Sequence, residues 1–345
     1  MTAVHQAVAG AGPYDAVSEQ ARAWRQLLSQ AGHGGADYTG QAAPGTHGFE
    51  PLAHLEPAPG DLIVIRYSAW SSSLGRLLER PQRKLLVYHN ITPPGYLWNH
   101  SPPLAIQCAV GRIQLPAFAR SARVVIADSE FNAGELYAAG AESVRVVPIL
   151  FEPGRLAPRG HAPEGDGPLV LVVGRLVPNK RHDRVFRAFA AYQRECEPEA
   201  RLLCVGTSLN HRYAALMQTL ADASGARNVR LAGGLAQDEV NAAYAEADVL
   251  LTLSEHEGFC VPLLEAFHFG VPVVAAPAGA VPGVAGHAAL YTDGDPAVTA
   301  ELIDMAVRDA QLREELEQRG RERLEHFAYE RTAQTVREVV REALA

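Results

Sequence analysis

The chain has 345 residues, of which 48% are hydrophobic and 20% charged, with a formal net charge of −8. This composition is typical of a globular protein with one or two hydrophobic cores, and ordinary domain sizes favour two. Without a basic block it gives no electrostatic reason to expect nucleic acid as a partner, and its apolar runs are far shorter than the roughly 20 residues that cross a bilayer.

The first part of the sequence alternates between expected strands and helices. We expect strands at residues 3–8, 61–67, 84–88, 123–127 and 144–149, and helices at 18–31, 73–79, 104–120 and 132–139. Residues 36–59 are rich in Gly, Pro and His and show no clean period, so we expect loops there. Because strands alternate with helices, a parallel sheet is predicted.

A change of composition at residues 152–168, towards Pro, Gly and charge, predicts a boundary between domains 1–150 and 151–326. A second series of strands follows at 169–173, 202–205, 229–232, 249–253, 271–275 and 289–291, and each but the last precedes a plausible helix. The predicted fold is therefore α/β, with two Rossmann-like, doubly wound parallel sheets. A charged helical tail covers residues 300–345, with breaks expected near Gly320 and Phe327.

The most informative segment lies at residues 254–270, where Glu257 and Glu265 stand eight positions apart across an expected strand-to-helix turn. Gly258 permits an abrupt change of direction, and Pro262 suits the first turn of a helix. A helix N-terminus can hold phosphate, and two carboxylates can accept hydrogen bonds from hydroxyl groups. Phosphate together with sugar hydroxyls indicates a nucleotide sugar.

Three segments resemble the retaining glycosyltransferases of family 4, which have the GT-B fold. The two glutamates resemble the family's E-x7-E signature, and residues 270–275 resemble the strand after its donor helix. The segment Gly174-Arg175-Leu176-Val177-Pro178-Asn179-Lys180 is similar to its G-R-L-x-P-x-K sequence. Fainter similarity is found at residues 88–90 and 127–132.

The resemblance implies an active site in a cleft between two facing domains. Residues 1–150 would bind the acceptor, 151–326 would bind the nucleotide-sugar donor, and the final helix, at about 327–345, would cross back to the first domain. Glu265 would accept from the ribose hydroxyls and Glu257 would hold the sugar. Further donor contacts would come from Gly258, Phe259, Cys260, Val261 and Gly174. Cys260 departs from the family, which commonly has glycine there.

Arg175 and Lys180 are expected to neutralise the diphosphate that leaves with the nucleotide, in place of a divalent metal. The competing interpretation is a solvated basic loop. By the same resemblance His89 would contact the donor sugar, and the alternative is a histidine packed beside prolines and satisfied by the backbone. Gly12 follows the first expected strand and would bring the backbone close to the phosphates of the donor or to the acceptor, although a lone G-x-G pattern is weak evidence.

No metal or other cofactor is expected. Asp293-Gly294-Asp295 looks like a D-x-D metal motif, but its place after the last expected strand favours a solvent loop. The four cysteines have no C-x-x-C spacing, which favours reduced thiols and a cytoplasmic protein. No secretory signal is expected at the N-terminus. Residues 85–111 carry no formal charge and predict either an apolar surface, for an acceptor or for peripheral contact with the inner face of a membrane, or a buried loop.

The predicted function is retaining transfer of a hexose-type sugar in bacterial-type glycan, polysaccharide or glycoconjugate assembly. The donor would be a UDP-, GDP- or dTDP-sugar, and the acceptor a hydroxyl of a saccharide, a lipid-linked molecule or a small molecule. Two alternatives stay open. One is an epimerase or phosphorylase on the same scaffold, and the other is a noncatalytic protein that binds nucleotide sugars.

Overall fold

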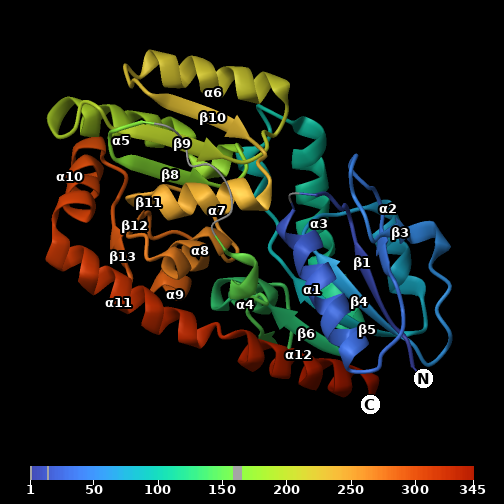
Figure 1. Cartoon of the computed structure of the whole chain (residues 1–345). Coiled ribbons are helices and arrows are strands. Elements are labelled where there is room, and N and C mark those ends of the chain that lie inside the picture. The colour runs from blue at the N-terminus through green and yellow to red at the C-terminus, as the bar shows by residue number, and fades with distance from the viewer. Residues whose placement is uncertain (1, 14, 158–164) are drawn as a thin grey trace. The chain divides into compact units, whose positions relative to one another are not determined.

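The structure is a computed structural model that describes residues 2–13, 15–157 and 165–345 (Figure 1). The chain divides into two compact units. Unit 1 comprises Met1–Phe151 and Phe327–Ala345, and unit 2 comprises Glu152–His326. Unit 1 is therefore built from two separate stretches of chain, whereas unit 2 is continuous.

Unit 1 contains a parallel sheet whose strand order is β3-β2-β1-β4-β5-β6-β7. Its strands are β1 (Val4–Val8), β2 (Asp37–Thr39), β3 (Glu50–Pro51), β4 (Leu62–Tyr67), β5 (Arg83–Tyr88), β6 (Val124–Ala127) and β7 (Arg145–Val146). Its helices are α1 (Ala16–Gln30), α2 (Ser72–Gly75), α3 (Pro102–Ser121), α4 (Glu130–Ala138) and α12 (Tyr329–Leu344), with short 3-10 turns η1 (Leu52–His54), η2 (Arg76–Glu79) and η3 (Pro94–Tyr96).

Helix α12 completes the core of unit 1. Its buried residues recur every three or four positions and form one apolar face, which includes Val336, Val339 and Val340. That face joins Trp24 and Leu27 of α1 in a single hydrophobic cluster with the strands. The predicted return of the last helix to the first domain is confirmed.

Unit 2 contains a second parallel sheet, in the order β10-β9-β8-β11-β12-β13. Its strands are β8 (Leu169–Val173), β9 (Arg201–Val205), β10 (Val229–Gly233), β11 (Val249–Thr252), β12 (Val273–Ala275) and β13 (Ala289–Tyr291). Its helices are α5 (His182–Glu195), α6 (His211–Ala223), α7 (Gln237–Glu246), α8 (Val261–Phe269), α9 (Val281–Ala285), α10 (Pro296–Arg308) and α11 (Ala310–His326), with turns η4 (Pro153–Arg155) and η5 (Pro178–Lys180).

Two expectations about local structure are wrong. Residues 36–59, expected to be loops, contain β2 and β3, because β2 pairs in parallel with β1 and β3 pairs in parallel with β2. The expected helix break near Gly320 does not occur, because α11 runs through it. A Cβ atom at Gly320 would lie 3.0 Å from the ring of Phe267. This glycine serves close packing rather than a turn.

Membrane-spanning helices are absent from the described part of the chain. None of its helices combines the length and the apolar character that crossing a bilayer requires.

Candidate functional site

The predicted donor residues of unit 2 lie in the loops that follow β8 and β11, two neighbouring strands of its sheet, and on helix α8, into which the second loop leads. Carboxyl ends of adjacent parallel strands lie at the same edge, where such sheets bind ligands. Asn179 ties the two loops together. Its side-chain amide donates to the backbone carbonyl of His256 at 3.0 Å, and its backbone carbonyl accepts from the N–H of Glu255 at 2.8 Å.

Lys180 and Glu257 form an ion pair at this edge. The Lys180 ammonium donates to the Glu257 carboxylate at 2.5 Å, and both side chains are largely buried. Burial alone favours the neutral amine, but the Glu257 charge more than offsets it, so the pKa of Lys180 is raised. Lys180 is therefore a fixed cation at neutral pH. Its ammonium also lies above Gly174, where a Cβ atom would be 3.3 Å from the nitrogen.

Arg175 lies beside this pair and differs from it in being exposed. It makes no hydrogen bond or ion pair with any residue that the structure describes. Its charge nevertheless acts on Lys180, whose pKa it lowers slightly against the larger effect of Glu257. The loop after β8 thus holds one cation that is paired and one that is available for an anion.

Neighbouring arginines are occupied by carboxylates instead. Arg181 pairs with Asp183 and Glu255, and Arg184 contacts Glu255 at 2.9 Å. Arg181 has a φ of 53°, a left-handed conformation unusual for a residue with a side chain. Among the arginines of this loop and of the start of α5, the geometry therefore favours Arg175 as an anion ligand.

The loop after β11 turns sharply into α8. Cys260 precedes the helix with a φ of 76°, a conformation that suits glycine and costs about 1–2 kcal/mol for other residues. Its thiol is buried, and burial together with the charge of Glu257 raises its pKa, so the neutral thiol is the stable form. Phe259 is also buried, whereas Gly258 and Val261 are partly exposed.

A glycine of a third loop fixes the position of Glu257. Gly279 follows β12 with a φ of 59°, and a Cβ atom there would lie 2.4 Å from the carbonyl oxygen of Glu257. The adjacent N–H of Ala280 donates to that same carbonyl at 2.9 Å. Only glycine permits this close approach of the two backbones.

Glu265 on α8 has a partner that the sequence analysis missed. The hydroxyl of Tyr244, on α7, donates to one carboxylate oxygen of Glu265 at 2.7 Å. Burial raises the pKa of Glu265, and this hydrogen bond counters the effect only in part. Tyr244 is fully buried and stacks on Phe269, with 5.5 Å between ring centroids. The two residues are twenty-one positions apart, so no local motif links them.

His182, at the start of α5, is a buried histidine without a hydrogen-bonding partner. It is 1% exposed, and neither ring nitrogen bonds to any described residue. Burial, with a contribution from the charge of Lys180, lowers the pKa of His182 to about 4. The ring is therefore neutral at physiological pH, and its position next to Phe186 makes it part of the apolar core.

His89 and Gly12, the two remaining predicted site residues, belong to unit 1. The Nδ1 atom of His89 lies 2.7 Å from the Asp128 carboxylate, and its Nε2 atom lies 3.1 Å from the Arg66 guanidinium. The side chain is only 5% exposed. The N–H of Gly12 donates to the Ser18 hydroxyl at the start of α1. Sequence reasoning named His89 as a site residue and noted a fainter similarity at residues 127–132, which include Asp128, but it did not name Arg66.

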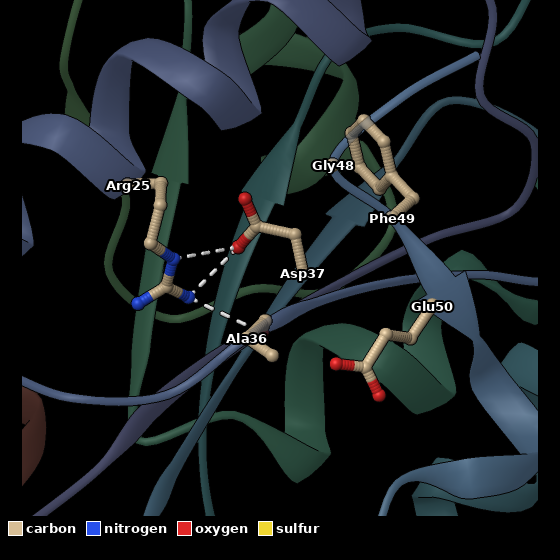
Figure 2. A pocket seen from close by; sticks show the side chains of 6 residues that line it. All are labelled: Arg25, Ala36, Asp37, Gly48, Phe49 and Glu50. Atoms are coloured by element: carbon tan, nitrogen blue, oxygen red, sulfur yellow. Dashed lines mark hydrogen bonds and ion pairs between the residues drawn. The ribbon is translucent and has the colours of Figure 1, made fainter.

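Unit 1 also has an open pocket of about 450 Å³ beside β2 and β3 (Figure 2). It is lined by Arg25, Ala36, Asp37, Gly48, Phe49 and Glu50. Arg25 donates to Asp37 and to the carbonyl of Ala36, as the dashed lines of Figure 2 show. None of the residues predicted from the sequence as site residues lines this pocket.

Groups of three or more His, Cys, Asp or Glu side chains able to hold a metal ion are not found among the described residues. In the D-x-D segment, the carboxylate of Asp295 accepts from the N–H groups of Ala297 and Val298 and so caps α10. The four cysteines are thiols rather than disulfides. That the reaction needs no metal stays a prediction.

Sequence comparison relates this chain to known families. The family model described as "Glycosyl transferases group 1" matches residues 156–323. A D-inositol 3-phosphate glycosyltransferase of Salinispora arenicola is 31% identical over 230 residues, which cover 63% of this chain and 51% of the relative. A GDP-mannose-dependent alpha-(1-6)-phosphatidylinositol monomannoside mannosyltransferase of Mycobacterium tuberculosis is 32% identical over 140 residues, covering 38% of this chain and 35% of the relative. The chain thus spans about half the length of the first of these relatives.

Solved structures match almost the whole chain. Sucrose-phosphate synthase from Thermosynechococcus elongatus has a TM-score of 0.78 at 19% identity, with 99% of each chain covered. HepE of Anabaena, in complex with UDP and glucose, has a TM-score of 0.72 at 19% identity, with 98% of this chain and 99% of that chain covered. At such identities the likeness shows the fold, which is the predicted GT-B architecture of two Rossmann-like domains.

Proposed function

Since residues 156–323 match the family model of the glycosyl transferases group 1, we propose that the chain transfers a hexose-type sugar from a nucleotide donor to an acceptor hydroxyl, with retention of configuration and without a metal ion. The observation that carries this proposal is the arrangement at the edge of the sheet in unit 2. There Arg175, which has no partner among the described residues, the Lys180–Glu257 ion pair and the start of α8 come from loops that follow neighbouring strands.

The proposed donor site divides the nucleotide sugar among these groups. Arg175, Lys180 and the N-terminus of α8 supply positive charge for the diphosphate. Glu265 has one carboxylate oxygen bound to Tyr244, which leaves the other for the ribose hydroxyls. Glu257 would accept from hydroxyls of the transferred sugar while it stays paired with Lys180. One similar protein has been solved in complex with UDP and glucose, and another is GDP-mannose-dependent, which supports this class of donor.

The proposed reaction forms a bond between the acceptor oxygen and the anomeric carbon of the sugar. The bond from that carbon to the diphosphate oxygen breaks, and the acceptor proton passes to the departing phosphate. Glu257 makes a poor nucleophile because the ion pair with Lys180 stabilises the negative charge of its carboxylate. Retention then follows from attack on the same face that the diphosphate leaves. Cations fixed before the reaction stabilise the negative charge that grows on the leaving group.

Unit 1 would bind the acceptor, and helix α3 with the segment before it offers exposed side chains for an apolar one. Trp98, Ile106 and Ile113 are large apolar residues that are 46%, 51% and 78% exposed. No Asp or Glu occurs between residues 81 and 127. An apolar surface with only basic charges supports a lipid-linked acceptor or peripheral contact with an anionic membrane. Co-sedimentation with anionic and with neutral vesicles, comparing the wild type with Ile113→Ser, tests this part separately.

The donor is tested by thermal unfolding in the presence of UDP-, GDP- and dTDP-sugars, because a bound ligand stabilises the fold. With the donor that protects, Arg175→Ala and Lys180→Ala should lower turnover about 10²–10³-fold, the usual loss when a fixed donor to a developing charge is removed. Arg187→Ala is the matched control. Its side chain is exposed on α5 and pairs only with Asp183 among the described residues. Unchanged turnover in both site variants would refute the proposal.

The same measurements separate the alternative functions. Binding of a donor without transfer to any acceptor would favour a noncatalytic protein. Conversion of the sugar in the absence of an acceptor would favour an epimerase.

A further inference from the structure

Arg66, on β4, is a fully buried arginine at the centre of unit 1. It is 0% exposed, and no carboxylate of the described residues pairs with it directly. Its guanidinium bonds to the Gln6 side chain at 2.8 Å and to the Gln20 carbonyl at 3.2 Å, and it lies 4.6 Å from the ring centre of Trp24. Burial lowers the pKa of Arg66 to about 10, so the group is still a cation at neutral pH.

The third contact of Arg66 is with His89, and its direction follows from chemistry. A guanidinium only donates hydrogen bonds, so the His89 Nε2 atom, 3.1 Å from Nη1, must accept and carries no proton. An ionised carboxylate only accepts, so Nδ1 must donate to Asp128 at 2.7 Å. Both ring nitrogens are therefore assigned, and the ring is a neutral imidazole protonated on Nδ1.

The same reasoning orders the other side of Arg66. Because Gln6 accepts from Arg66 through its oxygen, its amide nitrogen is free to donate, and it does so to Asp37 at 2.8 Å. Asp37 in turn accepts from Arg25 at the pocket of Figure 2. The buried chain runs from Asp128 to Arg25 with two cations, two anions and one possible direction for each bond.

We propose that Arg66 is a positioning residue that holds His89 in this single neutral form, so that His89 takes no part in proton transfer. The consequence for the reaction rests on the proposed function, whereas the state of the ring does not. A second proton on Nε2 would point at a guanidinium 3.1 Å away, with like charges and no acceptor between them. His89 can therefore orient a substrate but cannot act as its general base.

A cation performs this task better than a neutral amide would. Asparagine or glutamine at position 66 could turn its oxygen towards the ring and accept a proton from Nε2. Together with Asp128 it would then stabilise the doubly protonated ring. Arg66 removes that choice because it has no acceptor atom.

The first test reads the protons on the ring directly. In the full-length protein labelled with ¹⁵N, long-range ¹H–¹⁵N correlations at neutral pH should show a protonated Nδ1 and an unprotonated Nε2 for His89. In Arg66→Gln the Nε2 signal should move towards the protonated value, and Arg66→Lys should restore the wild-type pattern. A proton on Nε2 in the wild type, or an Arg66→Gln spectrum identical to that of the wild type, would overturn the proposal.

The second test separates positioning from general stability. Arg66→Gln should lower kcat about tenfold while the affinity for the free nucleoside diphosphate is unchanged, because the groups proposed to bind it, Arg175, Lys180 and Glu265, belong to unit 2. Lys84→Met is the matched control, since Lys84 is also a buried cation of unit 1 and bonds only to the carbonyls of Arg80 and Gln82 among the described residues. If that control loses as much kcat, Arg66 is merely structural. If no donor is ever transferred, the proposed function fails and the ring measurement still decides this inference.

Discussion

The two units share one plan, a parallel sheet with polar residues after its strands, yet they treat charge in opposite ways. In unit 1 the buried Arg66 has hydrogen-bonding partners in Gln6, Gln20 and His89. In unit 2 an exposed Arg175 stands without a partner among the described residues, beside a cation that is already fixed. A satisfied cation holds a fold together, whereas an unsatisfied one is ready for a ligand.

The largest expected effect is on stability and separates the two arginines. Arg66→Ala removes one member of a buried charge network and should cost about 3–5 kcal/mol of unfolding free energy. Arg175→Ala removes an exposed side chain and should change it by no more than about 0.5 kcal/mol. Denaturant titration of both variants provides the measurement. Equal losses would remove the distinction between the units.

Two histidines sharpen the same contrast, because His89 has partners for both ring nitrogens and His182 has none within the described part of the chain. Burial lowers the pKa of His182 from its ordinary value of 6.5 in the unfolded chain to about 4 in the folded protein. Below pH 6.5 the unfolded chain therefore binds a proton on His182 that the folded protein does not bind, and the free energy of unfolding falls until about pH 4. The loss is on the order of 3 kcal/mol.

The variant His182→Phe should lose this part of the pH dependence. Its unfolding free energy relative to the wild type should improve between pH 6.5 and pH 4 and stay constant above pH 7. Urea titrations at pH 8 and at pH 4.5 measure the difference. A variant whose stability declines with acid as steeply as that of the wild type would show that His182 is not the buried neutral ring described here.

The smallest expected effect concerns the hydroxyl of Tyr244. Tyr244→Phe removes the hydroxyl that donates a hydrogen bond to the Glu265 carboxylate. The pKa of Glu265 should therefore rise, and binding of the nucleotide sugar should weaken about tenfold, which is the usual contribution of one such hydrogen bond. Tyr192→Phe is the control, because the buried Tyr192 hydroxyl has no partner among the described residues. Calorimetric titration with the donor compares them. Equal affinities in the two variants would exclude a role for Tyr244.

The alternation of strands and helices made the two sheets predictable, but it did not predict β2 and β3 at the edge of the sheet in unit 1. Strands β2 and β3 have only a few residues each, and the pairing of β2 with β1 and of β3 with β2 is set by backbone contacts rather than by a pattern of their own. The helix around Gly320 was misread because a glycine can serve packing as well as a turn. Both errors arise where tertiary contacts override local preference.

Motifs supplied candidate residues of the site but not what holds them. Glu265 was named by its spacing from Glu257, yet Tyr244 comes from a preceding helix and bears no sequence relation to it. Arg66 lies within an apolar strand, where one charged residue reads as an edge position. Only the packing of β1, β4 and the end of β5 brings it to His89.

The division of unit 1 into two stretches of chain also sets an order of assembly. A ribosome delivers all of Glu152–His326 before it delivers the helix that fills the core of the first unit. Unit 2 is able to fold while its predecessor still lacks Val336, Val339 and Val340, so the half synthesised first is the half finished last. Nascent chains halted before residue 327 should therefore expose an open hydrophobic surface in unit 1, a natural target for chaperones.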